Sequence, residues 1–277
     1  KLQAKGITIT RITCDDSGKL DTREIESAIN EKTKLIVMTH CSNVSGSVVD
    51  LEAVGKISKA NDLYFVVDAA QTSGVIDVDM QKLNADAVCF TGHKSLLGPQ
   101  GIGGFIINDR MHPLVDTFIE GGTGSLSESE EQPDYMPDKF ESGTPNIIGI
   151  YGLNASLKYI NKVGKEGILK HEMHLVERFL SGIRKFEKIK IIGRQDIVNR
   201  LAVISVNFYG EDNSEIAHVL SSNFGIATRV GLHCAPSAHK TFGTYETGTV
   251  RFSFSSFNTD EEIDYTLDAI GQIMESL

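Results

Sequence analysis

Two short apolar runs decide the fold, Tyr64-Phe65-Val66-Val67-Asp68 and Ala87-Val88-Cys89-Phe90, and the second continues into Thr91-Gly92-His93-Lys94. Each run has the length of one strand and is followed by polar residues. Continuous apolar runs of this kind are typical of strands buried on both faces of a parallel sheet. Ligands of open α/β sheets bind at the carboxyl ends of the strands. Asp68 and Lys94 are therefore the first candidates for a functional site.

A carboxylate and an amine at neighbouring strand ends meet the needs of one cofactor. Pyridoxal 5'-phosphate takes a lysine as its Schiff-base partner and an acidic side chain beside its pyridine nitrogen. Asp68 and Lys94 together point to that cofactor. Taken singly, each has a plainer interpretation, a strand-end cap for Asp68 and a surface lysine for Lys94.

Composition narrows the class of protein. The chain has 277 residues, enough for one large domain or two ordinary ones. Its net charge of −10 argues against nucleic acid as a partner, and no apolar run is long enough to suggest a membrane partner. The four cysteines show no metal-ligand spacing, so no metal site is predicted. Reduced thiols are the expected state, which favours a cytoplasmic location.

The first part of the chain alternates between strand and helix patterns. Strands are expected at 7–12, 35–39, 64–68, 87–90 and 102–107, and helices at 21–29 and 51–60. This alternation predicts an α/β fold with a mostly parallel sheet. The run 102–107 follows Lys94 after a loop too short for a parallel crossover, so it is expected to be antiparallel. The strand at 35–39 is expected to be buried.

The second part of the chain has a different order of expected strands and helices. Residues 121–146 are rich in Gly, Ser, Glu and Pro, which indicates a long exposed loop. Helices are expected near 147–160, 165–186 and 214–223, strands at 202–208 and 249–254, and a last helix after the capping box Thr259–Glu262. We therefore predict a partial cofactor-binding large domain over 1–149 and a smaller α+β C-terminal domain over 150–277.

Six motifs in order carry a resemblance to a known family. They are Ser42-Asn43 with Gly46, Val67–Gln71, Thr91–Lys94, Phe140–Asn146, Arg229–Cys234 and Thr249–Ser253. Together they resemble the class V pyridoxal-phosphate aminotransferases, and most closely the cysteine desulfurases and selenocysteine lyases. The resemblance implies the fold-type I architecture of pyridoxal-phosphate-dependent transferases. It also implies that the chain lacks the family's N-terminal part, which carries a phosphate loop and a ring-stacking residue.

The resemblance assigns the cofactor end of the site. Lys94 would form the Schiff base and shuttle protons, with His93 beside it, and Asp68 would pair with the pyridine nitrogen. The remaining cofactor contacts would come from side chains near the ring hydroxyl and the phosphate, namely Asn43, Gln71, Thr91, His93 and Thr144. Thr144 would reach the cofactor of a neighbouring subunit, so the resemblance implies a homodimer.

The substrate end is implied in the same way. Arg251 would clamp the substrate carboxylate, a task that suits the planar guanidinium, and Arg229 would lie on the cofactor or substrate side. Cys234 lies in a Gly/Pro/Ser loop beside His233 and follows Leu232, where the family's desulfurases usually carry a second His. Its thiolate would attack the sulfur of L-cysteine, leaving L-alanine and an enzyme persulfide for a sulfur-acceptor protein.

Other interpretations of Cys234 and of the whole chain stay open at this stage. One is a class V aminotransferase, or a selenocysteine or cysteine β-lyase, in which Cys234 takes no part. Another is a non-catalytic fragment that holds no cofactor. The other three cysteines, Cys14, Cys41 and Cys89, are expected to be small buried apolar residues.

Overall fold

The computed structural model describes residues 2–276, and their contacts group into two compact units. One unit combines the chain up to Thr33, Thr39–Val54 and everything from Gly164 on, and the other combines Lys34–Met38 with Gly55–Val163. We call the second the lysine unit and the first the cysteine unit, after Lys94 and Cys234. The boundary expected between residues 149 and 150 stays a prediction, because units defined by contacts need not match functional domains.

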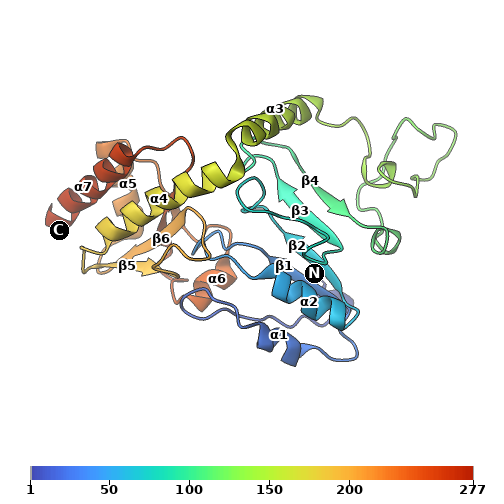
Figure 1. Ribbon diagram of the computed structural model, residues 1–277, viewed down its shortest axis with the longest axis horizontal. Coiled ribbons are helices and arrows are strands. Elements are labelled where there is room, and N and C mark those ends of the chain that lie inside the picture. The colour runs from blue at the N-terminus through green and yellow to red at the C-terminus, as the bar shows by residue number, and fades with distance from the viewer. Residues whose placement is uncertain (1, 277) are drawn as a thin grey trace. The chain divides into compact units, whose positions relative to one another are not determined.

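The lysine unit is built on a four-stranded sheet in the order β1-β2-β3-β4 (Figure 1). Its elements are β1 (Leu35–Thr39), most of α2 (Leu51–Ala60), β2 (Tyr64–Asp68), β3 (Ala87–Thr91), β4 (Gly103–Ile107), the 3-10 turns η2 (His112–Leu114) and η3 (Asp138–Phe140), and α3 (Ile147–Val163). Strands β2 and β3 are parallel and β4 is antiparallel to β3. Both predictions about strand direction are confirmed.

One face of this sheet is covered where α2 approaches it. Phe65 and Val67 of β2 are fully buried, and Val88 of β3 is 5% exposed. Gly55 of α2 lies so close to the backbone carbonyl of Leu83 that a Cβ atom would collide with it. A glycine at this position therefore lets the helix pack against the segment that leads into β3.

Two predictions for the early strands are wrong. Residues 7–12 form no strand, and Ile7 and Ile9 are 49% and 37% exposed. An apolar pattern is not enough there, because a strand also needs a hydrogen-bonded neighbour. Strand β1 exists as predicted, but Leu35 and Val37 are 45% and 64% exposed. It is the edge strand of its sheet, so fewer neighbours cover it.

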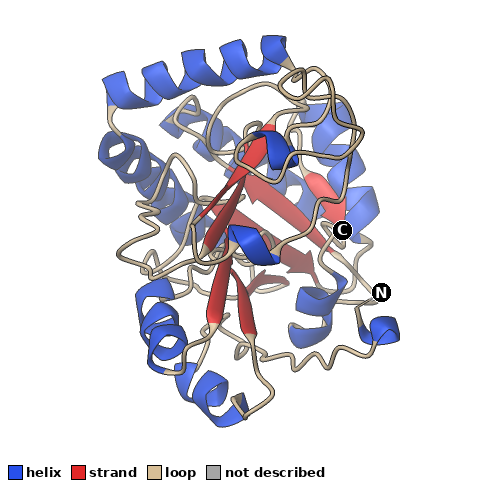
Figure 2. Cartoon of the chain, turned by 90° about the vertical axis from the view of Figure 1, so that its right-hand side faces the viewer, coloured by secondary structure: helices blue, strands red, loops and turns tan. Residues whose placement is uncertain are grey.

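The cysteine unit contains a second four-stranded sheet in the order β5-β6-β8-β7, with every neighbouring pair antiparallel. Its strands and helices are η1 (Gln3–Lys5), α1 (Thr22–Ala28), α4 (Lys165–Ile183), β5 (Ile189–Ile192), β6 (Val203–Phe208), α5 (Asn213–Phe224), β7 (Arg229–Gly231), α6 (Pro236–Thr241), β8 (Thr249–Ser253) and α7 (Asp260–Ser276). Figure 2 shows the strands of both sheets in red.

One apolar cluster packs this sheet against α4, α5 and α7. Phe179 of α4 contacts Phe252 and Phe254, with ring centroids 4.9 and 5.2 Å apart. Leu220 of α5 and Ile270 of α7 are fully buried in the same cluster. The sheet that carries Arg251 is therefore rigidly backed, which fixes the backbone from which the site residues project.

Local signals explain most helix starts in the cysteine unit. The Thr259 hydroxyl accepts from the Glu262 backbone N–H, and the Glu262 carboxylate accepts from the Thr259 N–H, so the predicted capping box is confirmed. Asp212 caps α5 through a hydrogen bond of 2.7 Å from Ser214 N. Among the strands and α-helices of this unit, the pattern analysis missed β5, β7 and α6. β5 and β7 are shorter than every other described strand, and α6 has fewer than two full turns in which a periodic pattern could show.

Candidate active site

Asp68 ends β2 at the edge of the sheet where β3 also ends. In the parallel register, Asp68 pairs with Cys89, and β3 continues to Thr91 before the turn that carries Lys94. Partial desolvation, and next the negative charge of Asp68, raise the pKa of Cys89. The Asp68 carboxylate is therefore close to the Cys89 side chain. Cys89 is exposed, so its prediction as a buried residue is wrong.

The Thr91–Gly98 turn is closed by backbone hydrogen bonds. Gly92 N donates to Ile102 O at 2.9 Å, Gly98 N donates to Gly92 O at 2.7 Å, and Leu97 N donates to Lys94 O at 2.8 Å. A Cβ atom on Gly92 would lie 3.0 Å from Ile102 O, so glycine permits this close approach. The turn presents Lys94 as an exposed side chain on a fixed backbone.

Some of the other predicted cofactor residues contact this turn, and others do not. Thr91 Oγ1 and His93 Nδ1 lie 3.0 Å apart, which brings a hydroxyl and an imidazole together. Ser95 Oγ donates to Gln71 O at 3.0 Å and so ties the segment after β2 to the turn. Thr144 lies farther along, in the exposed segment before α3. The lysine unit therefore ties Gln71 to the Thr91–Lys94 turn and places Asp68 on the strand beside β3.

These side chains fit the donor and acceptor groups of pyridoxal phosphate. Asp68 accepts a hydrogen bond on Oδ1 from Ala70 N at 2.9 Å, and a carboxylate oxygen beyond that bond can serve a protonated ring nitrogen. Thr91 and His93 carry a hydroxyl and a ring N–H of the kind that hold phosphate oxygens, and Lys94 supplies the amine. The set contains an acid, an amine and phosphate ligands, as the cofactor requires.

The cysteine unit gathers the other predicted residues around β7 and β8. Arg229 of β7 stands directly opposite Arg251 of β8, so the two side chains share a face of the sheet. Arg229 Nη2 donates to Cys234 Sγ at 3.3 Å. Arg251 Nη1 donates to Asn43 O at 3.0 Å, and Asn43 Nδ2 donates to His233 O at 2.7 Å. Asn43, Arg229, Arg251 and Cys234 thus form one cluster.

Two guanidinium groups on one face give this cluster a strong preference for anions. Burial, and next the positive charge of Arg229, lower the pKa of Arg251. Within residues 2–276, Arg251 Nε is buried and has no hydrogen-bond partner. A buried donor beside a like charge is costly unless an anion offsets it. A carboxylate of a small substrate is the simplest anion that does so.

Cys234 itself is exposed and lies in a strained turn. His233 and Cys234 have φ angles of 50° and 62°, a left-handed conformation that non-glycine residues rarely adopt. Helix α6 begins two residues later, with Pro236 in its first turn. The sequence identified the loop and the thiol, but it gave no signal for the conformation or for the contacts of His233 with Thr249 and of Asn43 with His233.

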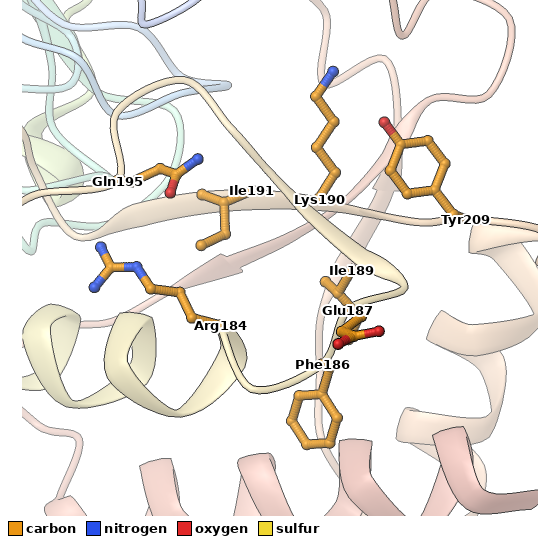
Figure 3. Close-up of a pocket in the computed structure, with 8 residues that line it drawn as sticks. All are labelled: Arg184, Phe186, Glu187, Ile189, Lys190, Ile191, Gln195 and Tyr209. Atoms are coloured by element: carbon orange, nitrogen blue, oxygen red, sulfur yellow. The ribbon is translucent and has the colours of Figure 1, made fainter.

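A pocket elsewhere in the cysteine unit takes no part in this chemistry (Figure 3). It has a volume of about 330 Å³ and lies where the end of α4 meets β5, lined by Arg184, Phe186, Glu187, Ile189, Lys190, Ile191, Gln195 and Tyr209. None of the predicted site residues lines it. The candidate chemistry therefore rests on the two clusters above.

Known proteins match this chain along its whole length. A sequence model of the Aminotransferase class-V family matches residues 1–266. The chain belongs to the class-V aminotransferases. It is 35% identical to a probable cysteine desulfurase of Methanothermobacter thermautotrophicus, with 100% of this chain and 68% of that protein aligned. It is 37% identical to a probable cysteine desulfurase of Pyrococcus abyssi, with 99% and 67% aligned.

The solved structures agree with this class-V assignment. The apo structure of a cysteine desulfurase from Thermococcus onnurineus NA1 superposes with a TM-score of 0.92 at 34% identity, covering 100% of this chain and 68% of that one. The predicted fold-type I architecture and the predicted family are thereby confirmed. The chain spans about two thirds of the length of these relatives. Among residues 2–276, no helix combines the length and apolar character that crossing a bilayer requires.

Proposed function

We propose that this class-V protein is a pyridoxal-phosphate-dependent cysteine desulfurase that moves sulfur from L-cysteine to Cys234 and releases L-alanine. The names of its relatives support this activity, since they are described as cysteine desulfurases. One structural observation carries the proposal. Cys234 is exposed and accepts a hydrogen bond from the Arg229 guanidinium at 3.3 Å, as expected of a thiol that works as a nucleophile.

The cofactor residues follow from the fit of the lysine unit. We propose that Lys94 binds pyridoxal phosphate covalently and that Asp68 keeps the ring nitrogen protonated. Gln71 and Asn43 serve the ring hydroxyl, and the phosphate is held by Thr91 and His93, with Thr144 serving a neighbouring subunit's cofactor. When bound, the cofactor supplies an electron sink for charge that develops at the substrate Cα.

The protein's side chains carry out the remaining steps of the proposed reaction. Arg251, with Arg229 opposite it, binds the substrate carboxylate. The Lys94 amine removes the Cα proton and later returns a proton to carbon. The Cys234 thiolate attacks the substrate sulfur, so that an S–S bond forms while the Cβ–S bond breaks. The sulfur leaves as a persulfide on Cys234, and the carbon skeleton leaves as alanine, so no external oxidant or reductant is needed.

The decisive experiment follows that sulfur atom. Purified protein with bound pyridoxal phosphate is mixed with L-cysteine, and the Cys234 peptide is analysed by mass spectrometry without reductant. We expect a gain of one sulfur atom on Cys234 and stoichiometric alanine. Cys234→Ser abolishes both, whereas Cys14→Ser, which removes another thiol of the cysteine unit, leaves both unchanged. Alanine release at the full rate from Cys234→Ser would instead point to a lyase or an aminotransferase that does not use this thiol.

A homodimer is part of the proposal, and the surface of the lysine unit supports it. Ile148 and Tyr151 of α3 are 87% and 71% exposed, and Phe118 and Ile119 of the preceding loop are 99% and 68% exposed. Large apolar side chains exposed to this degree are typical of an interface. We expect a dimer by sedimentation velocity. Ile148→Lys dissociates it, and Asn161→Lys, an exposed change on the same helix, does not.

The exposure of Cys234 also supports onward transfer. A persulfide on an exposed side chain is open to attack by the thiol of a sulfur-acceptor protein. The domain assignment is proposed in the same sense, with residues 1–149 contributing the cofactor part and residues 150–277 the smaller domain.

A further inference from the structure

The residue before Cys234 is held more firmly than a loop residue needs to be. His233 is 2% exposed, and its φ of 50° places it in the left-handed region together with Cys234. Two successive non-glycine residues in this region are strained. Such a conformation persists only where the surroundings impose it, so the contacts of His233 show what imposes it.

Three contacts hold His233 from different sides. His233 Nε2 lies 2.8 Å from Thr249 Oγ1, and the His233 carbonyl accepts from Asn43 Nδ2 at 2.7 Å. Its ring packs against the ring of His239, with centroids 5.4 Å apart. His239 is itself fully buried, and its Nδ1 lies 2.8 Å from Thr244 Oγ1. The imidazole and the carbonyl of His233 are therefore both fixed.

Protonation is not the task of this histidine at neutral pH. Burial, and next the positive charge of Arg251, lower the pKa of His233 to about 3. The ring is neutral under working conditions and has no proton to spare for the substrate. His233 can therefore contribute to the reaction through its fixed position.

Cys234 differs from its neighbour in its exposure and in its hydrogen bonding. Its side chain is exposed, and the hydrogen bond that involves it comes from Arg229 Nη2. The backbone on its N-terminal side is clamped through His233. The direction of the Cα–Cβ bond of Cys234, and hence the approach of Sγ to Arg229, depends on that clamp.

We propose that His233, held by Thr249, is a positioning residue that aims the Cys234 thiol at the Arg229 guanidinium and so keeps it ready for attack. The inference deepens the proposed function and rests on Cys234 as the sulfur acceptor. Thr249 is the part of the clamp best suited to testing, because it touches His233 and lies outside the predicted cofactor and substrate residues. It is fully buried, and valine has nearly the same shape without the hydroxyl.

The experiment measures thiol reactivity in the protein with bound pyridoxal phosphate and no substrate. Iodoacetamide labelling is followed by peptide mass spectrometry for wild type, Thr249→Val and Thr249→Ser. The readout is the labelling rate of Cys234 divided by that of glutathione added to the same sample. Only the period in which Cys41 stays unlabelled is used, because Cys41 is fully buried and reacts when the cysteine unit unfolds.

At pH 7 we expect the ratio to fall about three- to tenfold in Thr249→Val, as for a lost hydrogen bond that supports the aim of the thiol. Thr249→Ser keeps the hydroxyl and should keep the wild-type ratio. A residue that served stability alone would change the unfolding temperature and leave the ratio unmoved.

A second pair of variants tests the same inference from the histidine side. His233→Gln keeps a nitrogen at the reach of Nε2 and should retain most of the wild-type ratio, whereas His233→Ala should lose it. An unchanged or increased ratio in both Thr249→Val and His233→Ala overturns the proposal. That result would leave the persulfide experiment untouched, because labelling needs no substrate, so the two failures can be told apart.

Discussion

The lysine unit and the cysteine unit hold their reactive side chains in opposite ways. Lys94 extends from a turn whose hydrogen bonds join residues close in sequence, such as Gly98 N to Gly92 O at 2.7 Å. Cys234 follows a residue clamped by partners far away in sequence, Asn43 on one side and Thr249 on the other. One site is made by the ends of adjacent strands, and the other by side chains that converge on a strained turn.

The difference bears on what each site tolerates. A strand end in a parallel sheet is fixed by the whole sheet, so single side chains around Lys94 can change without moving its backbone. The turn at Cys234 depends on a few buried polar contacts, and losing one leaves its partner unsatisfied. We therefore expect mutations near Lys94 to change chemistry, and mutations near Cys234 to change chemistry and stability together.

Replacing the lysine itself should produce the largest effect. Lys94→Ala removes the proposed proton carrier, and we expect alanine formation from cysteine to fall by roughly 10²–10⁴-fold or more. Lys94→Arg, which keeps the charge but not a usable amine, should fall as far. Lys82→Ala, which removes another exposed lysine of the same unit, should have wild-type rates. A Lys94→Arg enzyme with more than a tenth of the wild-type turnover would contradict the assignment.

The arginine pair of the cysteine unit should come next. Arg251→Gln removes the half-buried guanidinium that faces Arg229, and we expect kcat/KM for cysteine to fall about 10- to 100-fold, mostly through KM. Because Arg229 also holds the Cys234 thiol, Arg229→Gln should lower kcat as well. Steady-state kinetics of the two variants side by side separates the roles. If both variants changed KM and kcat to the same extent, the two arginines would share a single role.

Sequence reasoning reached the lysine unit more completely than the cysteine unit. The predicted strands at 64–68 and 87–90, the antiparallel β4 and the turn to Lys94 follow from apolar runs and loop length, which are local properties. Sequence analysis failed where the exposure of a residue depends on the elements packed around it. The exposure of Val37 and Cys89 depends on what covers the sheet, and no pattern within a strand reports that.

The cysteine site shows the same limit more sharply. Cys234 could be identified as a candidate from its Gly- and Pro-containing loop, but its left-handed φ of 62° could not be foreseen for a non-glycine residue. The contact between Asn43 and His233 joins positions 190 residues apart. The resemblance to class-V enzymes predicts Asn43 near the cofactor ring, and in the structure its side-chain amide donates to His233 O.

A pair of glycine variants tests how far the cysteine site depends on close packing. Gly248 precedes Thr249 with φ of 60°, and a Cβ atom there would lie 2.8 Å from Gly231 Cα of β7. We expect Gly248→Ala to lower the free energy of unfolding by roughly 2–4 kcal/mol, from strain and collision together. Gly243 has φ of 67° and open space around it, so Gly243→Ala should cost only about 1–2 kcal/mol. Urea denaturation gives both values, and equal losses would show that packing against β7 is unimportant.

The smallest expected effect is on the slope of the free energy of unfolding against pH in acid. It tests the contacts that hold His233, the residue before Cys234. Burial first, and then Arg251, His239 and Arg229, lower the pKa of His233 from 6.5 to about 3. Between these values the unfolded chain binds a proton that the folded chain refuses. The His233 contribution to stability is therefore lost as pH falls from about 6.5 towards 3, and it is constant above that window.

In His233→Gln no such titration remains. The free energy of unfolding should fall more steeply with acid in wild type than in the variant, by up to about 1.4 kcal/mol per pH unit for one proton. His40 also has a lowered pKa, but both proteins share it, so its effect cancels in the difference. His239 packs against His233, so its titration is followed separately by NMR in both proteins. Urea unfolding at several pH values between 4 and 7 measures the difference in slope. Parallel curves would mean that His233 accepts a proton in the folded chain as readily as in the unfolded one. The contacts around His233 would then not hold the turn before Cys234 closed.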